Sequence, residues 1–298
     1  MKGIVMAGGA GTRLFPLTMA TSKHLLPVYD KPMVYYPLST LMLAGIREIL
    51  LISTPADLPR YEQLLGDGSR FGVRLEYKEQ PSPDGVAQAF LLGESFIGDE
   101  PCAIILGDNI FFGGGMQKAL KCAADRAEAG RATLFCHWVE NPERFGVAEF
   151  DADGRVISIE EKPERPKSHY CITGLFFCPR GVSGLARRVK RSPRGELELP
   201  SLNALYMELG LMDAQVLGPD FHWLDTGTVD ALEEAAAFVR STQARTGAQI
   251  AALEEVAYRN GWITREALLA TAEQYGRSQY GQYLKKTAND RVLEAASE

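Results

Sequence analysis

The chain has 298 residues, 46% of them hydrophobic and 23% charged, which is ordinary for a folded protein. This composition excludes a disordered or collagen-like chain, and a chain of this length buries enough surface to fold without disulfides or metal ions. The formal net charge of −6 excludes a global field that attracts nucleic acid or anionic lipid. A polyanionic ligand therefore needs a local cluster of cations.

The cysteines and the apolar runs bear on the cellular compartment. There are five cysteines, an odd number without a CxxC pair, and only four histidines, so no zinc-binding pattern is present. The apolar run at the N-terminus is too short for a secretion signal, and nothing approaches about 18 consecutive apolar residues. We expect a cytoplasmic protein with reduced thiols, without a nucleic-acid or membrane partner.

The first half of the chain alternates short apolar runs with amphipathic stretches. Short apolar runs bounded by Gly, Pro or Asp predict buried parallel strands, here Lys2–Ala7, Ile49–Ser53, Val73–Glu79, Cys102–Leu106 and Ala132–Trp138. Helical spacing predicts helices over Pro32–Ala44, Asp57–Leu65, Gly85–Phe96 and Met116–Ala129. Repeated strand–helix units predict an α/β fold with a doubly wound, mostly parallel sheet.

The second half has a different pattern. Gly146–Phe150 and Val156–Glu161 predict a hairpin around Asp153-Gly154, and Tyr170–Cys178 predicts a further strand. Helices are expected over Leu199–Leu209 and Val229–Thr246, two more within 250–276, and a partly frayed tail over the last twenty residues. We therefore expect a core over residues 1–227 and a helical C-terminal extension over 228–298.

A glycine-rich loop directly follows the first predicted strand. Gly8, Gly9 and Gly11 precede Arg13, and glycines here let backbone N–H groups surround phosphate oxygens. The loop lacks the GxxxxGK[ST] pattern of a P-loop, and Leu14 replaces a glycine that a dinucleotide fingerprint needs. A tight turn without a ligand is the structural alternative. The nearby cations favour phosphate binding.

Several ordered motifs carry a family resemblance. They are GGAGTRLFPLT from Gly8, SKHLLPVYDKPMVYYPLS from Ser22, QPSPDGVAQAF from Gln80, LGDNIFF from Leu106, EEKPERPKS from Glu160 and WLDTGT from Trp223. Together they resemble the bacterial glucose-1-phosphate thymidylyltransferases, within the sugar nucleotidyltransferase superfamily. The resemblance runs from Met1 to about Lys286.

The resemblance implies a fold, a reaction and partners. It implies a Rossmann-like core, Mg²⁺ as cofactor, a homotetramer and feedback inhibition by a dTDP-deoxysugar. The implied substrates are dTTP and glucose 1-phosphate, and the products are dTDP-glucose and pyrophosphate. Three readings compete with this one: an enzyme that uses UTP or another sugar phosphate, a catalytically silent homologue that binds sugar nucleotides, and an NAD-dependent dehydrogenase, which Leu14 already disfavours.

The resemblance also assigns residues to the nucleotide. The implied nucleotide-binding residues are Gly8, Gly9, Gly11, Thr12, Arg13, Gln80, Gly85 and Asp108. Gln80 and Gly85 would recognise thymine, because a carboxamide complements the N3–H and O4 of the base. A hydrogen bond that caps the loop is the structural alternative for Gln80. Uracil is not convincingly excluded, because one methyl group gives modest discrimination.

Three cations and two aspartates match the chemistry of nucleotidyl transfer. By resemblance, Arg13 binds the β- and γ-phosphates, Lys23 lies near the α-phosphate, and Lys162 holds the phosphate of the sugar. Asp108 ends a predicted strand, and it would bind Mg²⁺ together with Asp225. The structural alternatives are an Asx turn at Asp108 and a helix N-cap at Asp225.

The expected sugar site draws on the second half of the chain. By resemblance it is formed by Gly146, Glu161, Lys162, Tyr170, Thr173 and Trp223. Glu161 would accept hydrogen bonds from sugar hydroxyls, and Gly146 would leave room for the ring. Thr173 and Trp223 have structural alternatives, as a strand residue and as a core aromatic.

The chain departs from the family pattern at three places. His24 stands where the family usually has Gln, which predicts a pH-dependent affinity for the nucleotide. Pro200-Ser201 replaces Thr-Asp at a place that suits a helix start. Gly113-Gly114-Gly115 replaces a pattern with an aromatic residue and a His, and it predicts a looser loop after Asp108. Feedback control is therefore not carried over with the resemblance.

Overall fold

The computed structural model describes residues 1–193 and 195–290. A mixed sheet forms its centre, with strands in the order β10-β9-β11-β6-β1-β4-β5, while β8 pairs with β11 and with β12. These strands are β1 (Lys2–Met6), β4 (Glu48–Ser53), β5 (Arg74–Glu79), β6 (Cys102–Leu106), β8 (Ala132–Trp138), β9 (Gly146–Phe150), β10 (Val156–Glu161), β11 (Tyr170–Cys178) and β12 (Met212–Leu217).

Strand β1 lies in the middle of the parallel part of the sheet. Its residue Ile4 pairs with Leu50 of β4 on one side and with Ile104 of β6 on the other. Alternate residues point to opposite faces, so Val5 joins one hydrophobic cluster and Ile4 joins the other. Burial on both faces explains why these strands are continuous apolar runs.

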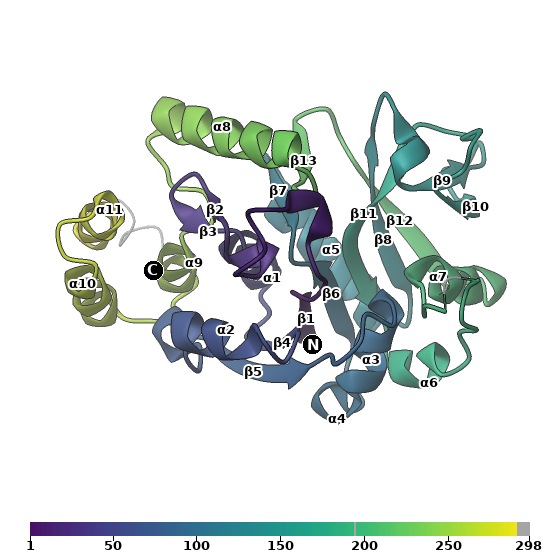
Figure 1. Cartoon of the computed structure of the whole chain (residues 1–298), viewed down its shortest axis with the longest axis horizontal. Coiled ribbons are helices and arrows are strands. Elements are labelled where there is room, and N and C mark those ends of the chain that lie inside the picture. The colour runs from purple at the N-terminus through teal and green to yellow at the C-terminus, as the bar shows by residue number, and fades with distance from the viewer. Residues whose placement is uncertain (194, 291–298) are drawn as a thin grey trace.

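Helices cover both faces of the sheet (Figure 1). One face packs against α1 (Tyr35–Leu43), α2 (Leu58–Leu65), α5 (Met116–Glu128), α8 (Val229–Thr246) and α9 (Leu253–Arg259). The other face packs against α3 (Ala89–Leu92), α4 (Glu94–Ile97), α6 (Val182–Ala186) and α7 (Leu199–Glu208). This arrangement confirms the predicted α/β class with a helix-flanked central sheet.

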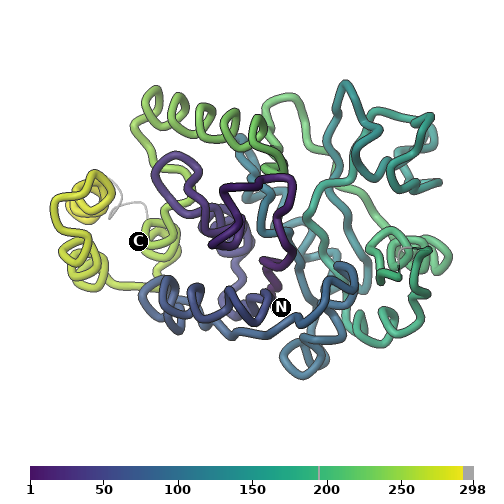
Figure 2. The backbone as a smooth tube through the Cα atoms, in the orientation of Figure 1, coloured from purple at the N-terminus to yellow at the C-terminus, as the bar shows by residue number. Residues whose placement is uncertain are grey.

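The last two helices, α10 (Arg265–Gln274) and α11 (Gln279–Ala288), form a small cluster of their own around Leu268 and Leu284. The backbone tube shows them at the end of the molecule away from β9 and β10 (Figure 2). Of the last twenty residues, which we expect to be frayed in part, Gln279–Ala288 form α11, and residues 291–298 lie outside the described part. The boundary at residue 227 stays a prediction.

Two predicted helices differ from the structure. Pro32 does not begin a helix, because β3 (Lys31–Pro32) pairs with β2 (Pro27–Val28) in a small hairpin, and α1 begins only at Tyr35. The helix predicted over 85–96 is a short 3₁₀ turn followed by α3 and α4, with the break at Gly93. A Cβ at Gly93 would lie 3.0 Å from the side chain of Leu50, so this helix meets the sheet closely.

Two strands absent from the predicted set form a separate ribbon. Strand β7 (Asn109–Gly113) pairs in antiparallel fashion with β13 (Phe221–Asp225). The prediction of a looser loop is therefore wrong at Gly113, which pairs with Phe221. A Cβ on Gly113 would lie 2.8 Å from the carbonyl oxygen of Asp220, so this close approach requires glycine.

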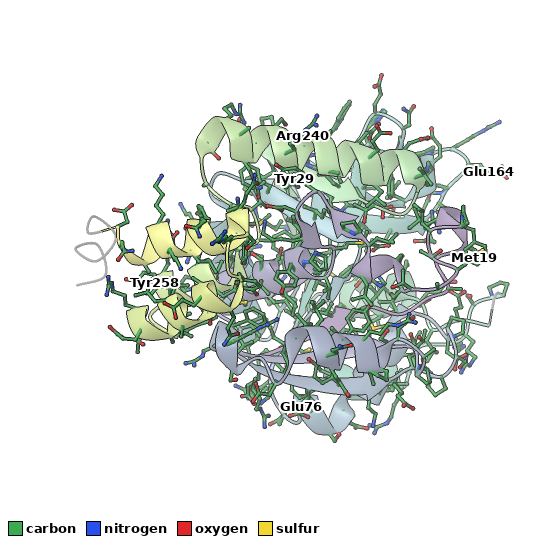
Figure 3. All side chains as sticks on the ribbon, turned by 60° about the vertical axis from the view of Figure 1, so that its left-hand side comes forward. Met19, Tyr29, Glu76, Glu164, Arg240 and Tyr258 are labelled. Atoms are coloured by element: carbon green, nitrogen blue, oxygen red, sulfur yellow. The ribbon has the colours of Figure 1, made fainter. Side chains whose placement is uncertain are left out.

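The segment between β1 and α1 exposes apolar side chains. Phe15, Leu17 and Met19 are exposed, and Figure 3 shows Met19 at the surface of the molecule.

No helix in the described part of the chain combines the length and apolar character that crossing a bilayer requires.

Candidate active site

The carboxyl ends of the parallel strands meet at one edge of the sheet, where open α/β sheets bind ligands. The glycine loop follows β1, Gln80 follows β5 and Asp108 follows β6. They open into a cavity of about 250 Å³ that also contains Lys23. From the predicted nucleotide set, this cavity is lined by Gly8, Gly9, Gln80, Gly85 and Asp108.

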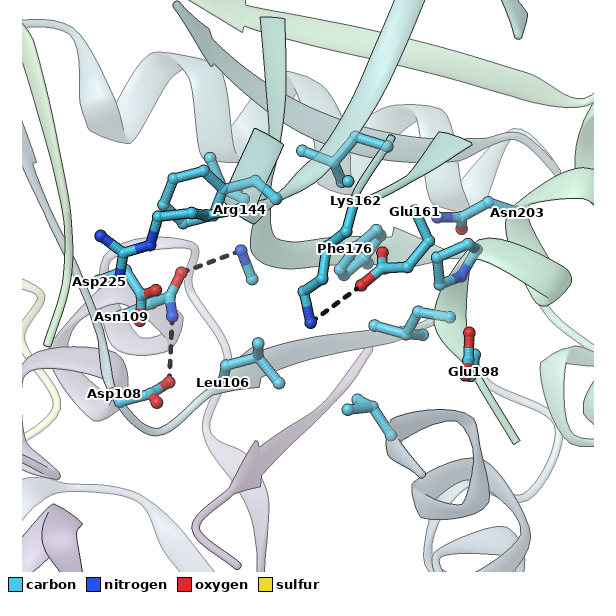
Figure 4. Close-up of a pocket in the computed structure, with 18 of the residues that line it drawn as sticks. Leu106, Asp108, Asn109, Arg144, Glu161, Lys162, Phe176, Glu198, Asn203 and Asp225 are labelled. Atoms are coloured by element: carbon cyan, nitrogen blue, oxygen red, sulfur yellow. Dashed lines mark hydrogen bonds and ion pairs between the residues drawn. The ribbon is translucent and has the colours of Figure 1, made fainter. Parts of the chain in front are cut away.

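A second cavity, of about 350 Å³, adjoins the first at Asp108, which lines both (Figure 4). From the predicted set, the second cavity is lined by Arg13, Asp108, Gly146, Glu161, Lys162, Thr173, Trp223 and Asp225. Gly11, Thr12 and Tyr170 line neither cavity. The ring of Tyr170 packs edge-on against Phe150, with ring centroids 5.4 Å apart.

Asp108 and Asp225 come together because β7 and β13 pair. Asp225 stands opposite Asn109 in this ribbon, next to Asp108. Thr226 anchors the junction, because its backbone N–H and its hydroxyl donate to the carbonyl oxygen of Asp108 at 3.1 and 2.8 Å. The N-cap of α8 is Thr228, so the structural alternative for Asp225 does not apply.

The two aspartates have different electrostatic surroundings. Burial acts to raise the pKa of Asp108. The charge of Lys23, with which Asp108 forms an ion pair, and the hydrogen bonds from Lys23 and Asn109 act in the opposite direction, and the pKa is lowered to about 2. Burial and the charge of Asp108 raise the pKa of Asp225 to about 6. A buried and a half-buried carboxylate that repel each other favour a cation between them.

This pair of carboxylates fits Mg²⁺. Mg²⁺ takes one or two carboxylates and completes its octahedron with water and substrate phosphate oxygens. The described residues contain no group of three or more His, Cys, Asp or Glu side chains able to hold a metal ion. Zinc or a fully protein-ligated Ca²⁺ therefore fits this site poorly, whereas the donors that Mg²⁺ prefers are present at Asp108 and Asp225.

Asn109 organises the junction between the two cavities. Its side-chain oxygen accepts hydrogen bonds from the indole N–H of Trp223 at 2.6 Å and from the backbone N–H of Gly174 at 3.0 Å. Its amide nitrogen donates to the Asp108 carboxylate at 3.1 Å, a bond between two side chains that differs from the Asx turn considered as the structural alternative for Asp108. Trp223 therefore has a positioning role at the wall of the cavity.

Lys162 and Glu161 lie at the end of β10, inside the second cavity. The Lys162 ammonium is 3.4 Å from the Glu161 carboxylate, and Lys162 has a left-handed backbone conformation with φ of 45°. Such strain at a residue other than glycine concentrates at functional sites. A Cβ on Gly146 would lie 3.1 Å from the Glu161 carboxylate, so glycine leaves this carboxylate room.

Gln80 is buried at the floor of the first cavity. Its amide nitrogen donates to Gln88 at 2.8 Å, and a Cβ on Gly8 would lie 2.9 Å from its side-chain oxygen. Gly85 is required for another reason than base contact, because a Cβ there would lie 2.3 Å from the carbonyl oxygen of Leu197. Its φ of 100° also excludes other residues.

The expectation for His24 is wrong. His24 is 1% exposed, its ring lies 3.2 Å from the Ser22 hydroxyl, and burial lowers its pKa to about 3. The ring is therefore neutral throughout the physiological range and does not supply a charge to a phosphate. A pH dependence of nucleotide affinity does not follow from this residue.

The lining residues outside the predicted set include Asn109, Arg144 and Asn203. Asn109 follows a predicted ligand directly, so its place at the strand end was a usable signal. Arg144 precedes the hairpin, and its charge acts on Asp225. Asn203 lies in the helix predicted over Leu199–Leu209, which also contains Pro200-Ser201. No motif around Asn203 in the sequence indicates a ligand-binding role.

Comparison with known proteins identifies the family. The model of the nucleotidyl transferase family matches residues 2–242. The chain belongs to this family.

Similar proteins indicate where the chain falls within the nucleotidyl transferase family. The chain is 54% identical to glucose-1-phosphate thymidylyltransferase of Neisseria meningitidis over 284 residues, which cover 95% of this chain and 98% of that protein. It is 50% identical to the enzyme of that name from Mycobacterium tuberculosis, with the same coverage. A Bacillus anthracis structure in complex with sucrose, assigned as a glucose-1-phosphate thymidylyltransferase, superposes with a TM-score of 0.74 at 37% identity, covering 80% of this chain and 95% of that chain.

Proposed function

We propose that this chain transfers the dTMP moiety of dTTP to α-D-glucose 1-phosphate, giving dTDP-glucose and pyrophosphate. The observation that carries the proposal is the meeting of two cavities at Asp108, with Lys23 in one and Arg13 and Lys162 in the other. Two phosphate-bearing substrates must be held against each other for this reaction. Two adjoining cavities lined with cations suit that task.

The proposed step is one in-line displacement at the α-phosphorus. A phosphate oxygen of glucose 1-phosphate forms the new bond to phosphorus, and the bond from phosphorus to the bridging oxygen of the β-phosphate breaks, so pyrophosphate leaves with that electron pair. A phosphate monoester has a second pKa near 6 and is already largely dianionic at neutral pH. The reaction therefore does not require a general base such as a histidine.

The protein's own residues supply position and charge. Lys162 holds the phosphate of the sugar, and Lys23 stabilises charge at the α-phosphate. Arg13 binds the β- and γ-phosphates with its planar fork. Its guanidinium lies beside Asp225, since a Cβ on Gly227 would be 3.0 Å from Arg13 and 3.4 Å from the Asp225 carboxylate.

Asp108 and Asp225 would hold Mg²⁺, which neutralises phosphate charge when bound. Support comes from the buried carboxylate of Asp108, the half-buried carboxylate of Asp225 and the raised pKa of Asp225 beside Asp108. The family resemblance further supports a cytoplasmic homotetramer, whereas feedback inhibition by a dTDP-deoxysugar is not carried over with it because of the departure at Gly113-Gly114-Gly115. Light scattering tests the tetramer, and inhibition assays with dTDP-deoxysugars test the feedback.

A pyrophosphate-release screen tests the function. The purified chain is assayed with dTTP or UTP against a panel of sugar 1-phosphates, each with and without a chelator. The expected result is preferred turnover of dTTP and glucose 1-phosphate, weaker turnover of UTP, and loss of both with the chelator. Preference for UTP or for another sugar would identify a sister enzyme, and no release with any pair would identify a silent homologue.

A further inference from the structure

Asn203 is a buried carboxamide with an unused donor. It lies on α7 and is 3% exposed, and its amide nitrogen has no hydrogen-bond partner among the described residues. Buried polar atoms without partners are uncommon in folded proteins, and each calls for an explanation. The explanation here lies in its position, because Asn203 lines the same cavity as Lys162 and Glu161.

A second atom of the same kind lines this cavity. The hydroxyl of Thr173 on β11 is buried and has no partner in the described part of the chain. Thr173 and Asn203 belong to different elements of the fold. Two unused polar groups that converge on one cavity indicate a ligand with several hydroxyl groups.

The position of Asn203 indicates which part of that ligand lies near it. Figure 4 shows Asn203 and Glu198 on the side of the pocket opposite Asp108 and Asp225, with Lys162 and Glu161 between them. The proposed function places the phosphate on C1 of the sugar at Lys162. Groups beyond Lys162 then meet the part of the ring away from C1.

We propose that Asn203 donates a hydrogen bond to a hydroxyl oxygen at C3, C4 or C6 of the hexose 1-phosphate, and that it thereby helps to determine which sugar is accepted. This inference rests on the proposed function. A neutral carboxamide suits a neutral hydroxyl, whereas the phosphate is already matched by Lys162. A site built to bond a hydroxyl rejects a substrate that lacks it, because the buried donor is then left unpaired.

The test compares wild type with Asn203→Leu on glucose 1-phosphate and its 3-deoxy, 4-deoxy and 6-deoxy analogues. Leucine keeps the volume of the side chain and removes both polar atoms. We expect wild type to lose about tenfold in kcat/KM with one of the analogues. For that analogue, the ratio of kcat/KM with glucose 1-phosphate to kcat/KM with the analogue should fall to near one in Asn203→Leu. The same ratio for the other two analogues should stay as in wild type.

A residue with a merely structural role would not move one ratio alone. Tyr206→Phe is the matched control, because Tyr206 lies on the same helix but lines a separate cavity with Arg180 and Leu209. We expect this control to leave all the ratios unchanged. If Asn203→Leu does not fold, Asn203→Ala is measured in the same way.

Three outcomes would overturn the assignment. The first is an unchanged kcat/KM of wild type with all three analogues, which means that no hydroxyl is bonded in this way. An equal loss on all four substrates in the variant indicates a structural residue. If wild type releases no pyrophosphate from dTTP and glucose 1-phosphate, the proposed function itself fails, and the assignment of Asn203 fails with it.

Discussion

Asp225 stands directly opposite Asn109 in the ribbon of β7 and β13, which sets its carboxylate beside that of Asp108. Burial and the charge of Asp108 raise the pKa of Asp225, and Asp108 itself forms an ion pair with Lys23. A divalent cation would remove the repulsion between the two carboxylates. The arrangement therefore ties the proposed metal site, the proposed nucleotide site and the second cavity to one short ribbon.

Replacing either aspartate tests that relationship. We expect Asp108→Asn and Asp225→Asn each to lower kcat/KM by at least about 100-fold, or about 2.7 kcal/mol of transition-state stabilisation. The physical reason is the loss of one anionic ligand of Mg²⁺ at nearly unchanged shape. Steady-state pyrophosphate release over a range of Mg²⁺ concentrations measures both the loss and the shift in metal requirement.

The matched control for these variants is Asp213→Asn. Asp213 pairs with Arg131 at 2.7 Å on strand β12 and lines neither of the two cavities. We expect near-normal kinetics from it. Near-normal activity in Asp108→Asn or in Asp225→Asn would instead refute the metal role of that residue.

The ribbon marks the limit of what local sequence patterns predict. Strands such as Cys102–Leu106 are buried on both faces, so their continuous apolar runs identify them and place Asp108 at a strand end. Strands β7 and β13 have five residues each, like β6, but each finds its partner only across more than a hundred residues of chain. The convergence of Asp108 with Asp225 was expected from resemblance, and its physical basis is visible only in the tertiary pairing.

Replacing Gly8 provides a separate test of nucleotide binding. In Gly8→Ala the added Cβ would lie 2.9 Å from the side-chain oxygen of Gln80, so the Gln80 amide must move. We expect the KM for dTTP to rise about tenfold, the size of one lost hydrogen bond, with a smaller change in the KM for glucose 1-phosphate. Initial rates with each substrate varied in turn measure both values.

The control for this variant is Gly184→Ala, because a Cβ on Gly184 has no neighbour within 4 Å. We expect its kinetics to match wild type. An unchanged KM for dTTP in Gly8→Ala would show that Gln80 does not contact the base. A fall in stability without a change in KM would show that Gly8 serves the turn alone.

The buried His24 makes stability depend on pH. Burial lowers the folded-state pKa to about 3, below the ordinary value of 6.5, so the unfolded chain binds more protons between these values. The free energy of unfolding therefore falls as the pH falls below about 6.5. For this one group the loss from pH 7.5 to 5.5 is about 1.4 kcal/mol.

Urea unfolding of wild type and His24→Gln at the two pH values isolates this contribution. Glutamine does not titrate, so the stability of wild type relative to the variant should decrease by about 1.4 kcal/mol at the lower pH. A difference that is the same at pH 7.5 and 5.5 would contradict a neutral buried ring. The KM for dTTP serves as a second readout, and no His24-dependent change in it is expected over this range.

Two residues that sequence patterns missed line the second cavity. Asn203 belongs to a helix whose pattern reports only its packing face, and Arg144 lies in a short 3₁₀ turn where no element was predicted. An amphipathic helix such as α7 shows which side is buried, and it does not show that one buried position faces a cavity. Strand ends are more informative, because in a parallel sheet they all meet at the same edge.

The C-terminal helices depend on a buried carboxylate. Glu254 of α9 is fully buried and accepts hydrogen bonds from the hydroxyls of Tyr275 at 2.7 Å and Tyr280 at 2.5 Å, which come from the end of α10 and from α11. In Glu254→Ala both phenols lose their acceptor inside the protein. We expect a loss of about 2–4 kcal/mol in the free energy of unfolding, measured by urea denaturation.

Tyr275→Phe and Tyr280→Phe each remove one donor and should cost less than Glu254→Ala, about 1 kcal/mol each. A change below about 0.5 kcal/mol in Glu254→Ala would mean that apolar packing around Leu268 and Leu284 holds these helices without the carboxylate.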